Sequence, residues 1–316
     1  MKRILVLFEP EHFEGLPKEL FRELNMDIVV YPFKFGFRNP FINFLKLIKK
    51  NNVEIFLLDY RPLAIQLLLS YLKIDNVKTN LIQHGHFEKN IQRNFQQRKL
   101  SWYLNSFYIT ILYLFYSHNE FNVFKRFKLV FLYFKFGSEK IIPLISKNKH
   151  IDKVFLLNND SLPTFKNDFK GSVSQINVVG KLDFDSFVFA KHGCTIYVTQ
   201  PFHLTGHSSK SNYTNYLKNL FIRNPEILFL KHPKIDSAFF YDINSEIKVI
   251  SKDSLKINHC QKVIGHFSSI LFGIDSNIEL ILDEYINDTL LKEVLIFNPY
   301  ETGVNGLNNI KQILND

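Results

Sequence analysis

The chain is poor in cysteine: among its 316 residues only Cys194 and Cys260 carry a thiol. Two cysteines cannot build the disulfide framework of small secreted domains, so we expect a reducing compartment, the cytoplasm. The opening MKRILVLFEP holds an apolar run of only five residues. Such a run is shorter than the core of a signal peptide, and it predicts a first buried strand instead.

Long apolar runs are also scarce. The segment 101–137 is dense in Tyr, Phe and Leu, but its longest uninterrupted apolar stretch, 107–116, has ten residues and includes a threonine. A membrane-spanning helix needs ~20. Two interpretations remain: a pair of helices buried in the first domain, or an aromatic surface at the periphery of the inner membrane that rests on anionic lipid. The basic residues of the segment are Lys125, Arg126, Lys128 and Lys135.

Several catalytic signatures are missing. The sequence contains no GxxxxGKS, GxGxxG, GxSxG or HExxH motif. P-loop, dinucleotide-dependent dehydrogenase, hydrolase and zincin functions therefore lose support. His84 and His86, with His203, His207 or His232, are candidate metal ligands. Because no third ligand stands at a fixed spacing, we predict neither a metal nor another cofactor.

Positive charge is concentrated in the first half of the chain. Residues 1–150 hold 23 Lys and Arg against 12 Asp and Glu, whereas residues 151–316 hold 16 against 18. A basic half indicates an anionic partner, either a membrane surface, a polyanionic glycan or nucleic acid. A solubilising bias without any partner is the alternative. The basic residues belong to no recognisable RNA- or DNA-binding module, so we do not expect nucleic acid.

Apolar runs of strand length alternate with stretches of helix length. Because the strand-like runs are continuously apolar, they predict parallel sheets covered on both faces. Two such series follow each other and join near 181–194. They predict an α/β protein of two Rossmann-like domains, residues 1–185 and 186–316, facing a cleft. The expected strands are 4–8, 27–33, 53–60, 79–85, 154–157, 176–180, 195–201, 226–233, 247–251, 262–268 and 294–299, and the expected helices are 40–50, 62–73, 211–224 and a terminal one after 303.

Polar groups cluster where four of these strands end. They are Gln83–His86, Gln200–His203, Lys231–Pro233 and Gly265–Ser269. Carboxyl ends of parallel strands share one edge of the sheet, where open α/β sheets bind ligands. A capped loop histidine is the ordinary explanation of one such residue, but four polar strand ends in one chain favour a site.

Ser268 and Ser269 precede an apolar run of helical character. Hydroxyls and free backbone N–H groups at a helix start attract an anion, although a serine there is also a good cap without a ligand. With His232 one strand away, a phosphate is the expected guest. His232 would stabilise or protonate the phosphate as it leaves, Lys231 would add a positive charge, and the 200–209 loop would help to bind the nucleotide through Gln200, His203 and His207.

A proton acceptor is expected on the other domain. A neutral His84 there is able to remove a proton from an incoming hydroxyl. Glu14 and Asp59 are carboxylate alternatives near other predicted strand ends or loops.

These motifs carry a family resemblance. A two-Rossmann chain with His232-Pro233 after a strand and Ser268-Ser269 about 35 residues later resembles the bacterial GT-B sialyltransferases and polysialyltransferases of capsule and lipooligosaccharide synthesis. It is also similar to a wider group that includes capsule Kdo transferases and CDP-glycerol glycerophosphotransferases. The resemblance implies that His232 contacts the CMP phosphate as an acid, and that the Ser-Ser pair binds this phosphate.

The first-domain motif departs from the sialyltransferase pattern. That family has an acidic pair followed by glycine, whereas this chain has Gln83-His84-Gly85. Histidine before glycine is closer to the teichoic-acid polymerase pattern, in which histidine is the proposed base. The resemblance therefore leaves two donors open, a CMP-activated sialic acid, other nonulosonic acid or Kdo, and a CDP-polyol.

The sequence thus predicts an inverting, metal-independent glycosyltransferase that moves the acidic sugar to a lipopolysaccharide, O-antigen or capsule glycan. A polyol-phosphate transferase is the alternative enzyme, and a non-enzymatic protein that binds nucleic acid or a membrane is the third hypothesis.

Overall fold

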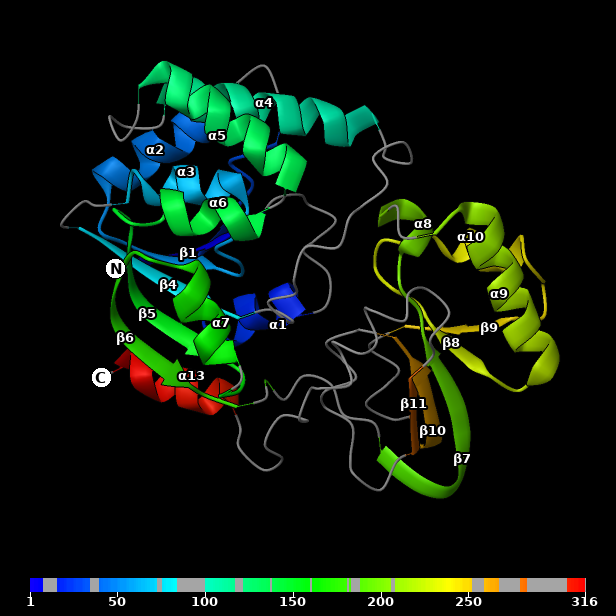
Figure 1. Ribbon diagram of the computed structural model, residues 1–316. Helices are drawn as coiled ribbons and strands as arrows, with labels where there is room; N and C mark the ends of the chain where they lie inside the picture. The colour runs from blue at the N-terminus through cyan, green and yellow to red at the C-terminus, as the bar shows by residue number, and fades with distance from the viewer. Residues whose placement is uncertain are drawn as a thin grey trace. The chain divides into compact units, whose positions relative to one another are not determined.

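The computed structural model folds into two compact units, each built on a parallel sheet (Figure 1). The first unit holds the strands β1 to β6, and the second holds β7 to β11. The structure describes residues 1–7, 16–34, 40–72, 76–83, 100–116, 122–136, 138–159, 161–180, 182, 188–205, 208–251, 259–266, 279–282 and 306–315.

The first sheet has six parallel strands in the order β2-β1-β3-β4-β5-β6. All five residues of β3 are buried, which follows from its apolar pattern, interrupted only by Glu54. The strands are β1 (Lys2–Val6), β2 (Ile28–Val30), β3 (Val53–Leu57), β4 (Val77–Ile82), β5 (His150–Leu156) and β6 (Ser172–Val178).

Helices connect these strands. α4 and α5 pack on α3 and α6, and Figure 1 shows α4 and α5 as the outermost helices on their side of the sheet. The helices are α1 (Leu16–Glu23), α2 (Pro40–Lys50), α3 (Leu63–Leu69), α4 (Leu100–Tyr116), α5 (Val123–Phe136), α6 (Ser138–Ile145) and α7 (Ser161–Asp168).

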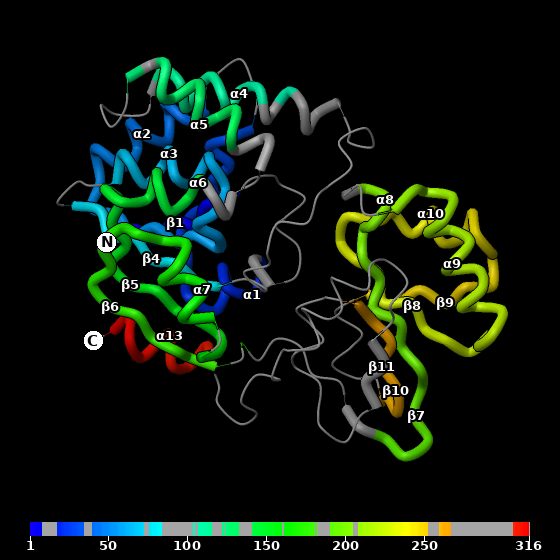
Figure 2. Tube along the Cα trace, viewed as in Figure 1, coloured from blue at the N-terminus to red at the C-terminus, as the bar shows by residue number. Residues whose placement is uncertain are grey.

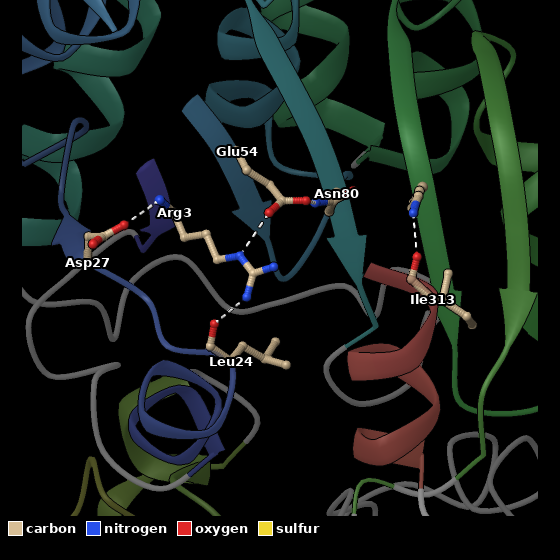
Figure 3. Close-up of polar contacts among 7 residues, drawn as sticks. Arg3, Leu24, Asp27, Glu54, Asn80 and Ile313 are labelled. Atoms are coloured by element: carbon tan, nitrogen blue, oxygen red, sulfur yellow. Dashed lines mark hydrogen bonds and ion pairs between the residues drawn. The ribbon is translucent and has the colours of Figure 1, made fainter. Parts of the chain in front are cut away.

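A polar network ties three strands of this sheet together (Figure 3). The Arg3 guanidinium donates through Nε to Glu54 Oε2 at 2.9 Å, and Asn80 Nδ2 donates to Glu54 Oε1 at 2.8 Å. The Arg3 guanidinium also donates through Nη1 to the backbone oxygen of Leu24 at 2.9 Å. The backbone N–H of Arg3 donates to the Asp27 carboxylate. Glu54 is buried on β3, so these partners are what make its charge tolerable there.

The second sheet has five parallel strands in the order β11-β10-β7-β8-β9. Its strands are β7 (Val188–Val198), β8 (Leu228–Leu230), β9 (Lys248–Ile250), β10 (His259–Gly265) and β11 (Glu279–Leu282). Its helices are α8 (Phe202–Thr205), α9 (Lys210–Arg223) and α10 (Ser237–Tyr241). β11 was not among the predicted strands, and the predicted strand 294–299 lies outside the described residues.

Close backbone contact joins β7 to β10, the two central neighbours of this sheet. The register shifts on both sides of Cys260. A side chain at Gly193 would place its Cβ 2.7 Å from the carbonyl carbon of Cys260, so only glycine fits there.

Each sheet has a point where the order of its strands reverses. In the second sheet the chain runs outward from β7 through β8 to β9, then returns to the other side of β7 with β10 and β11. This is the Rossmann order, and its switch point lies between β7 and β10. The first sheet reverses between β1 and β3, as flavodoxin-like sheets do. The prediction of an α/β protein with two parallel sheets is confirmed.

The last helix corrects the predicted domain boundary. α13 (Gly306–Asn315) belongs to the first unit, although the sequence placed 186–316 in the second domain. Asn309 Nδ2 donates to the backbone oxygen of Val179 at 3.0 Å, and Lys311 pairs with Glu23 at 3.0 Å. Figure 2 shows α13 beside the end of β6. The physical reason is the apolar face of α13, which is buried there at Leu307 and Ile310.

The aromatic segment 101–137 forms two helices with two different faces. Leu112 and Tyr113 of α4, and Leu129 and Val130 of α5, are buried in the core of the first unit. This part agrees with the predicted buried helical pair, while other aromatic side chains of α4 and α5 face away from the core. Among the described residues, no helix is long and apolar enough to cross a membrane.

We predict that Ile310→Ala lowers the free energy of unfolding of the first unit by about 2–4 kcal/mol, since it deletes a fully buried side chain. Hydrogen exchange of β5 and β6 peptides should accelerate, because α13 belongs to their unit. Gln312→Ala, an exposed neighbour on the same helix, is the control and should leave the exchange unchanged. Normal exchange in Ile310→Ala would show that α13 does not stabilise the first unit.

Candidate functional site

Polar residues follow three neighbouring strands at the switch point of the second sheet. Thr199 and Gln200 follow β7, Lys231 and His232 follow β8, and His266 follows β10. These strands are adjacent and parallel, so all five residues stand at one edge. The structure therefore brings together Gln200, Lys231 and His232 from the predicted set. This edge is where open α/β sheets bind nucleotides.

A tight turn holds His232. Its backbone oxygen accepts the N–H of Ile235 at 2.9 Å, and Pro233 occupies the first corner of this turn, where its fixed φ fits. The Lys234 N–H donates to His232 Nδ1 at 3.1 Å. Because Nδ1 acts as an acceptor, the neutral imidazole carries its proton on Nε2. His232 is half-buried and Pro233 is exposed.

Thr199 joins the ends of β7 and β8. Its hydroxyl donates to the backbone oxygen of Leu230 at 2.7 Å and accepts the backbone N–H of His232 at 2.9 Å. Thr199 is 1% exposed, so water does not compete for these bonds. The hydroxyl therefore fixes the point at which the chain leaves β8 and enters the His232 turn. Sequence reasoning did not single out Thr199.

His266 lies in an aromatic cluster beside the same edge. The Tyr197 hydroxyl and His266 Nε2 lie 2.9 Å apart, and both residues are buried. The rings of His266 and Phe202 meet edge to face with centroids 5.0 Å apart. The sequence placed His266 in a strand-end cluster but gave it no role. Its contacts position the end of β10, directly before the chain reaches Ser268 and Ser269.

The ring of His203 belongs to an aromatic stack. It lies 4.4 Å from the Phe239 ring and 5.6 Å from the Tyr213 ring, nearly parallel to both. The Tyr213 hydroxyl accepts the N–H of Gln200 at 3.3 Å, and Lys210 Nζ lies 5.9 Å from the centre of the Phe239 ring. His203 therefore has a packing role in this unit, and its predicted contact with the nucleotide remains a prediction.

Several predicted site residues cannot be placed. His84 and His207, the pair Ser268 and Ser269, the carboxylate alternative Glu14 and the candidate metal ligand His86 lie outside the described residues. Their predicted roles stay predictions. Among the described residues, no group of three or more His, Cys, Asp or Glu side chains is arranged to hold a metal ion.

Gln83 anchors the end of β4 in the first unit. Its side chain is fully buried; Nε2 donates to Ser161 Oγ at 2.8 Å, and Oε1 accepts the N–H of Leu157 at 2.9 Å. Asn158 Oδ1 accepts both the N–H and the hydroxyl of Ser161. These bonds join the carboxyl ends of β4 and β5 to the start of α7. Gln83 is thus a structural residue that fixes the chain where His84 follows.

Asp59, the carboxylate alternative at the end of β3, is held by its neighbour. Arg61 donates to Asp59 Oδ1 from its backbone N–H at 3.0 Å and from Nε at 3.1 Å, and to Oδ2 at 3.2 Å. Arg61 therefore occupies both carboxylate oxygens of Asp59, which leaves them less accessible to an acceptor hydroxyl.

The titratable groups with shifted pKa values do not supply a nucleophile. Burial raises the pKa of the Cys260 thiol to about 12, with the nearby Cys194 as a second cause, and burial also raises the pKa of Cys194. Both remain thiols at neutral pH and are therefore unreactive. Burial, with Asp168 beside it, raises the pKa of Tyr60 far above its usual range. Its hydroxyl stays protonated and donates to Asp168 at 3.0 Å.

A polar pocket lies at the opposite, amino edge of the first sheet. It has a volume of about 300 Å³, and its charged lining residues are Arg3, Arg22, Glu23 and Lys311. The three cations are ion-paired: Arg3 with Glu54, and Arg22 and Lys311 with Glu23. The Lys311–Glu23 pair joins α13 to α1, and Arg3 joins β1 to β3 and, through the backbone oxygen of Leu24, to the end of α1. The charged residues of this pocket therefore hold the elements around it together.

We predict that Thr199→Val lowers the free energy of unfolding by roughly 1–3 kcal/mol, because the His232 N–H loses its buried partner. Thr199→Ser keeps the hydroxyl and should retain most of the free energy of unfolding. Thr214→Val on α9 is the control, because it makes the same substitution elsewhere in the unit. Urea denaturation of the variants measures the effect. Equal stability of Thr199→Val and the parent protein would contradict the role of this hydroxyl.

Comparisons with known proteins are sparse. No family model matches the chain, and a search of curated proteins finds no match. Among solved structures, one described as "Crystal structure of GtfA/B complex" aligns at 9% identity with a TM-score of 0.31. The alignment covers 87% of this chain and 56% of the solved chain, so this chain spans about half the length of the solved one. A likeness this weak carries no information about chemistry.

Proposed function

We propose that this protein is an inverting, metal-independent GT-B glycosyltransferase. The donor would be a cytidine-nucleotide sugar, CMP-sialic acid or a related acid such as Kdo, and the acceptor a glycan of lipopolysaccharide, O-antigen or capsule. One observation supports the proposal: Gln200, Lys231 and His232 follow the neighbouring strands β7 and β8 at the carboxyl edge of the Rossmann-ordered sheet, beside its switch point. A nucleotide bound at that edge would meet a cation and an imidazole, and by our proposal also the two serines that follow β10 in the chain.

His232 would act on the leaving phosphate. The hydrogen bond from Lys234 to Nδ1 leaves the proton of the neutral ring on Nε2, which makes that atom a donor. As the bond between the anomeric carbon and the phosphate oxygen breaks, negative charge grows on the phosphate. His232 would donate to that oxygen, and Lys231 would lower the energy of the charge.

Ser268 and Ser269 would complete the phosphate site. They follow β10 by three and four residues. The buried contact between Tyr197 and His266 fixes the end of that strand. Their hydroxyls and backbone N–H groups are suited to phosphate oxygens. Gln200, His203 and His207 would contact the rest of the nucleotide, and Pro233 would hold the turn.

A base would remove the proton of the acceptor hydroxyl. His84 is our choice, because it follows directly on Gln83, whose buried side chain anchors the end of β4. Asp59 is less suitable because Arg61 occupies both of its oxygens. The hydroxyl oxygen would attack the anomeric carbon from the side opposite the phosphate. The products would be the inverted glycoside and CMP, with one proton moved to the base.

A polyol-phosphate transferase is the second candidate. The His84-Gly85 pair favours it, because this pattern is closer to that of the teichoic-acid polymerases. In that reaction the acceptor hydroxyl would attack phosphorus of a CDP-polyol, and CMP would again leave through its phosphate. The same residues around His232 would serve both reactions.

A nucleotide screen tests the proposed site. CMP or CDP at 100 times its Kd should raise the thermal midpoint by roughly 5–8 °C, because the ligand binds only the folded state. UDP and GDP should raise it less. The double variant Lys231→Gln/His232→Gln should lose the response, and Lys218→Gln/His192→Gln, exposed residues of the same unit, should retain it. If the nucleotide raises the thermal midpoint of both double variants equally, Lys231 and His232 do not belong to the nucleotide site.

Turnover tests the roles. With CMP-sialic acid or CDP-glycerol as donor, release of CMP should fall by about 100-fold or more in His232→Ala and in His84→Ala, in keeping with the loss of a general acid or base. His192→Ala serves as the matched control. If Asp59→Ala or Glu14→Ala is more damaging than His84→Ala, the base is a carboxylate. If neither donor releases CMP with any acceptor glycan, the proposed function is wrong.

A further inference from the structure

The outward side of α4 and α5 is unusually apolar for a protein surface. All five exposed phenylalanines of the described chain lie on these two helices, and Phe124 and Phe115 are 87% and 76% exposed. We call this surface the α4–α5 outer face; it consists of Leu104, Phe107, Phe115, Phe124, Phe127 and Phe131. Exposed apolar residues are ordinary when scattered, but a cluster of this kind marks an interaction site.

Helix periodicity separates the outer face from the core. Phe124, Phe127 and Phe131 follow each other at spacings of three and four residues, which places them on one stripe of α5. Leu129 lies on the opposite side and Val130 on the flank between, and both are buried in the core. α5 therefore has two apolar stripes, of which the fold uses one.

The same division holds on α4. Leu104, Phe107 and Phe115 are exposed, while Leu112 and Tyr113 are buried. Arg126 of α5 donates to the backbone oxygen of Leu114 at 2.8 Å and so links the two helices. The exposed rings consequently sit on a helical pair that the core holds in place.

The charge of these helices has one sign. Neither α4 nor α5 contains an acidic residue, and α5 carries four basic ones. Lys125 and Lys128 are exposed next to the phenylalanines of the outer face. An apolar surface flanked by lysines is complementary to a partner that is anionic at its surface and apolar beneath it.

We propose that the α4–α5 outer face rests on an anionic lipid bilayer, with its phenylalanines among the acyl chains near the headgroups and Lys125 and Lys128 on lipid phosphates. The described helices are too short to span the bilayer, so the contact is peripheral. The proposal does not depend on the reaction that the protein catalyses. On the outer side of the helices, segment 101–137 would thus form the aromatic surface on anionic lipid that the sequence left open. The inner side of the same helices packs in the core.

Vesicle sedimentation of the full-length protein tests this surface. The protein should pellet with phosphatidylcholine vesicles that contain 30 mol % phosphatidylglycerol as a test composition, and much less with pure phosphatidylcholine. Phe124→Ser/Phe127→Ser/Phe131→Ser should lower the partition coefficient by more than about tenfold. Lys125→Gln/Lys128→Gln should lower it by roughly tenfold or more, and added salt should weaken binding of the parent.

Matched controls separate this face from general stickiness. Ile222→Ser/Tyr241→Ser removes two exposed apolar residues of the second unit, and Lys147→Gln/Lys218→Gln removes the same charge elsewhere. Both should bind like the parent, and circular dichroism should show unchanged folding of all variants. The proposal is wrong if the parent stays in the supernatant or if the triple Phe variant pellets normally. A dimer that the Phe variant dissociates, without vesicle binding, would instead assign the face to a second copy of the chain.

Discussion

The arrangement at the candidate site depends on one buried hydroxyl. Thr199 receives the backbone N–H of His232 and donates to the backbone oxygen of Leu230, and so it joins two parallel strands at the edge where they end. The ladder between the two strands stops where they diverge into loops, and the Thr199 hydroxyl adds a link at that point. The His232 turn begins at this link, and the backbone bond from Lys234 then selects the protonation of its ring. A chain of local bonds therefore determines which atom of His232 is a donor.

The two units use buried polar groups in the same way. Gln83 joins β4 and β5 at the carboxyl edge of the first sheet, much as Thr199 joins β7 and β8 in the second. At the amino edge, Glu54 is held by Arg3 and Asn80. A buried polar group is costly without partners, so each one restricts the pairing of its strands to a single arrangement. Specific geometry at the edges is the result.

The helical pair α4 and α5 shows how one sequence pattern can have two uses. The density of aromatic residues left both a buried pair and a surface pair open for segment 101–137. The structure contains both, because a helix has room for two apolar stripes. Leu129 lies in the core and Phe124 is almost fully exposed, only five residues apart. Composition alone cannot distinguish these stripes, since the distinction depends on which side of the helix meets the rest of the unit.

Local pattern was enough to predict many of the strands and helices of this protein, although β11 was missed. Continuous apolar runs such as 53–57 predicted parallel strands, and His232-Pro233 predicted the end of β8, because proline has no N–H with which to continue the ladder. The tertiary structure alone decided the non-local features. It placed α13 on the first unit, since the apolar face of Leu307 and Ile310 is buried there, and it buried His266 against Tyr197. Both outcomes depend on residues distant in the chain, whose contacts no local pattern encodes.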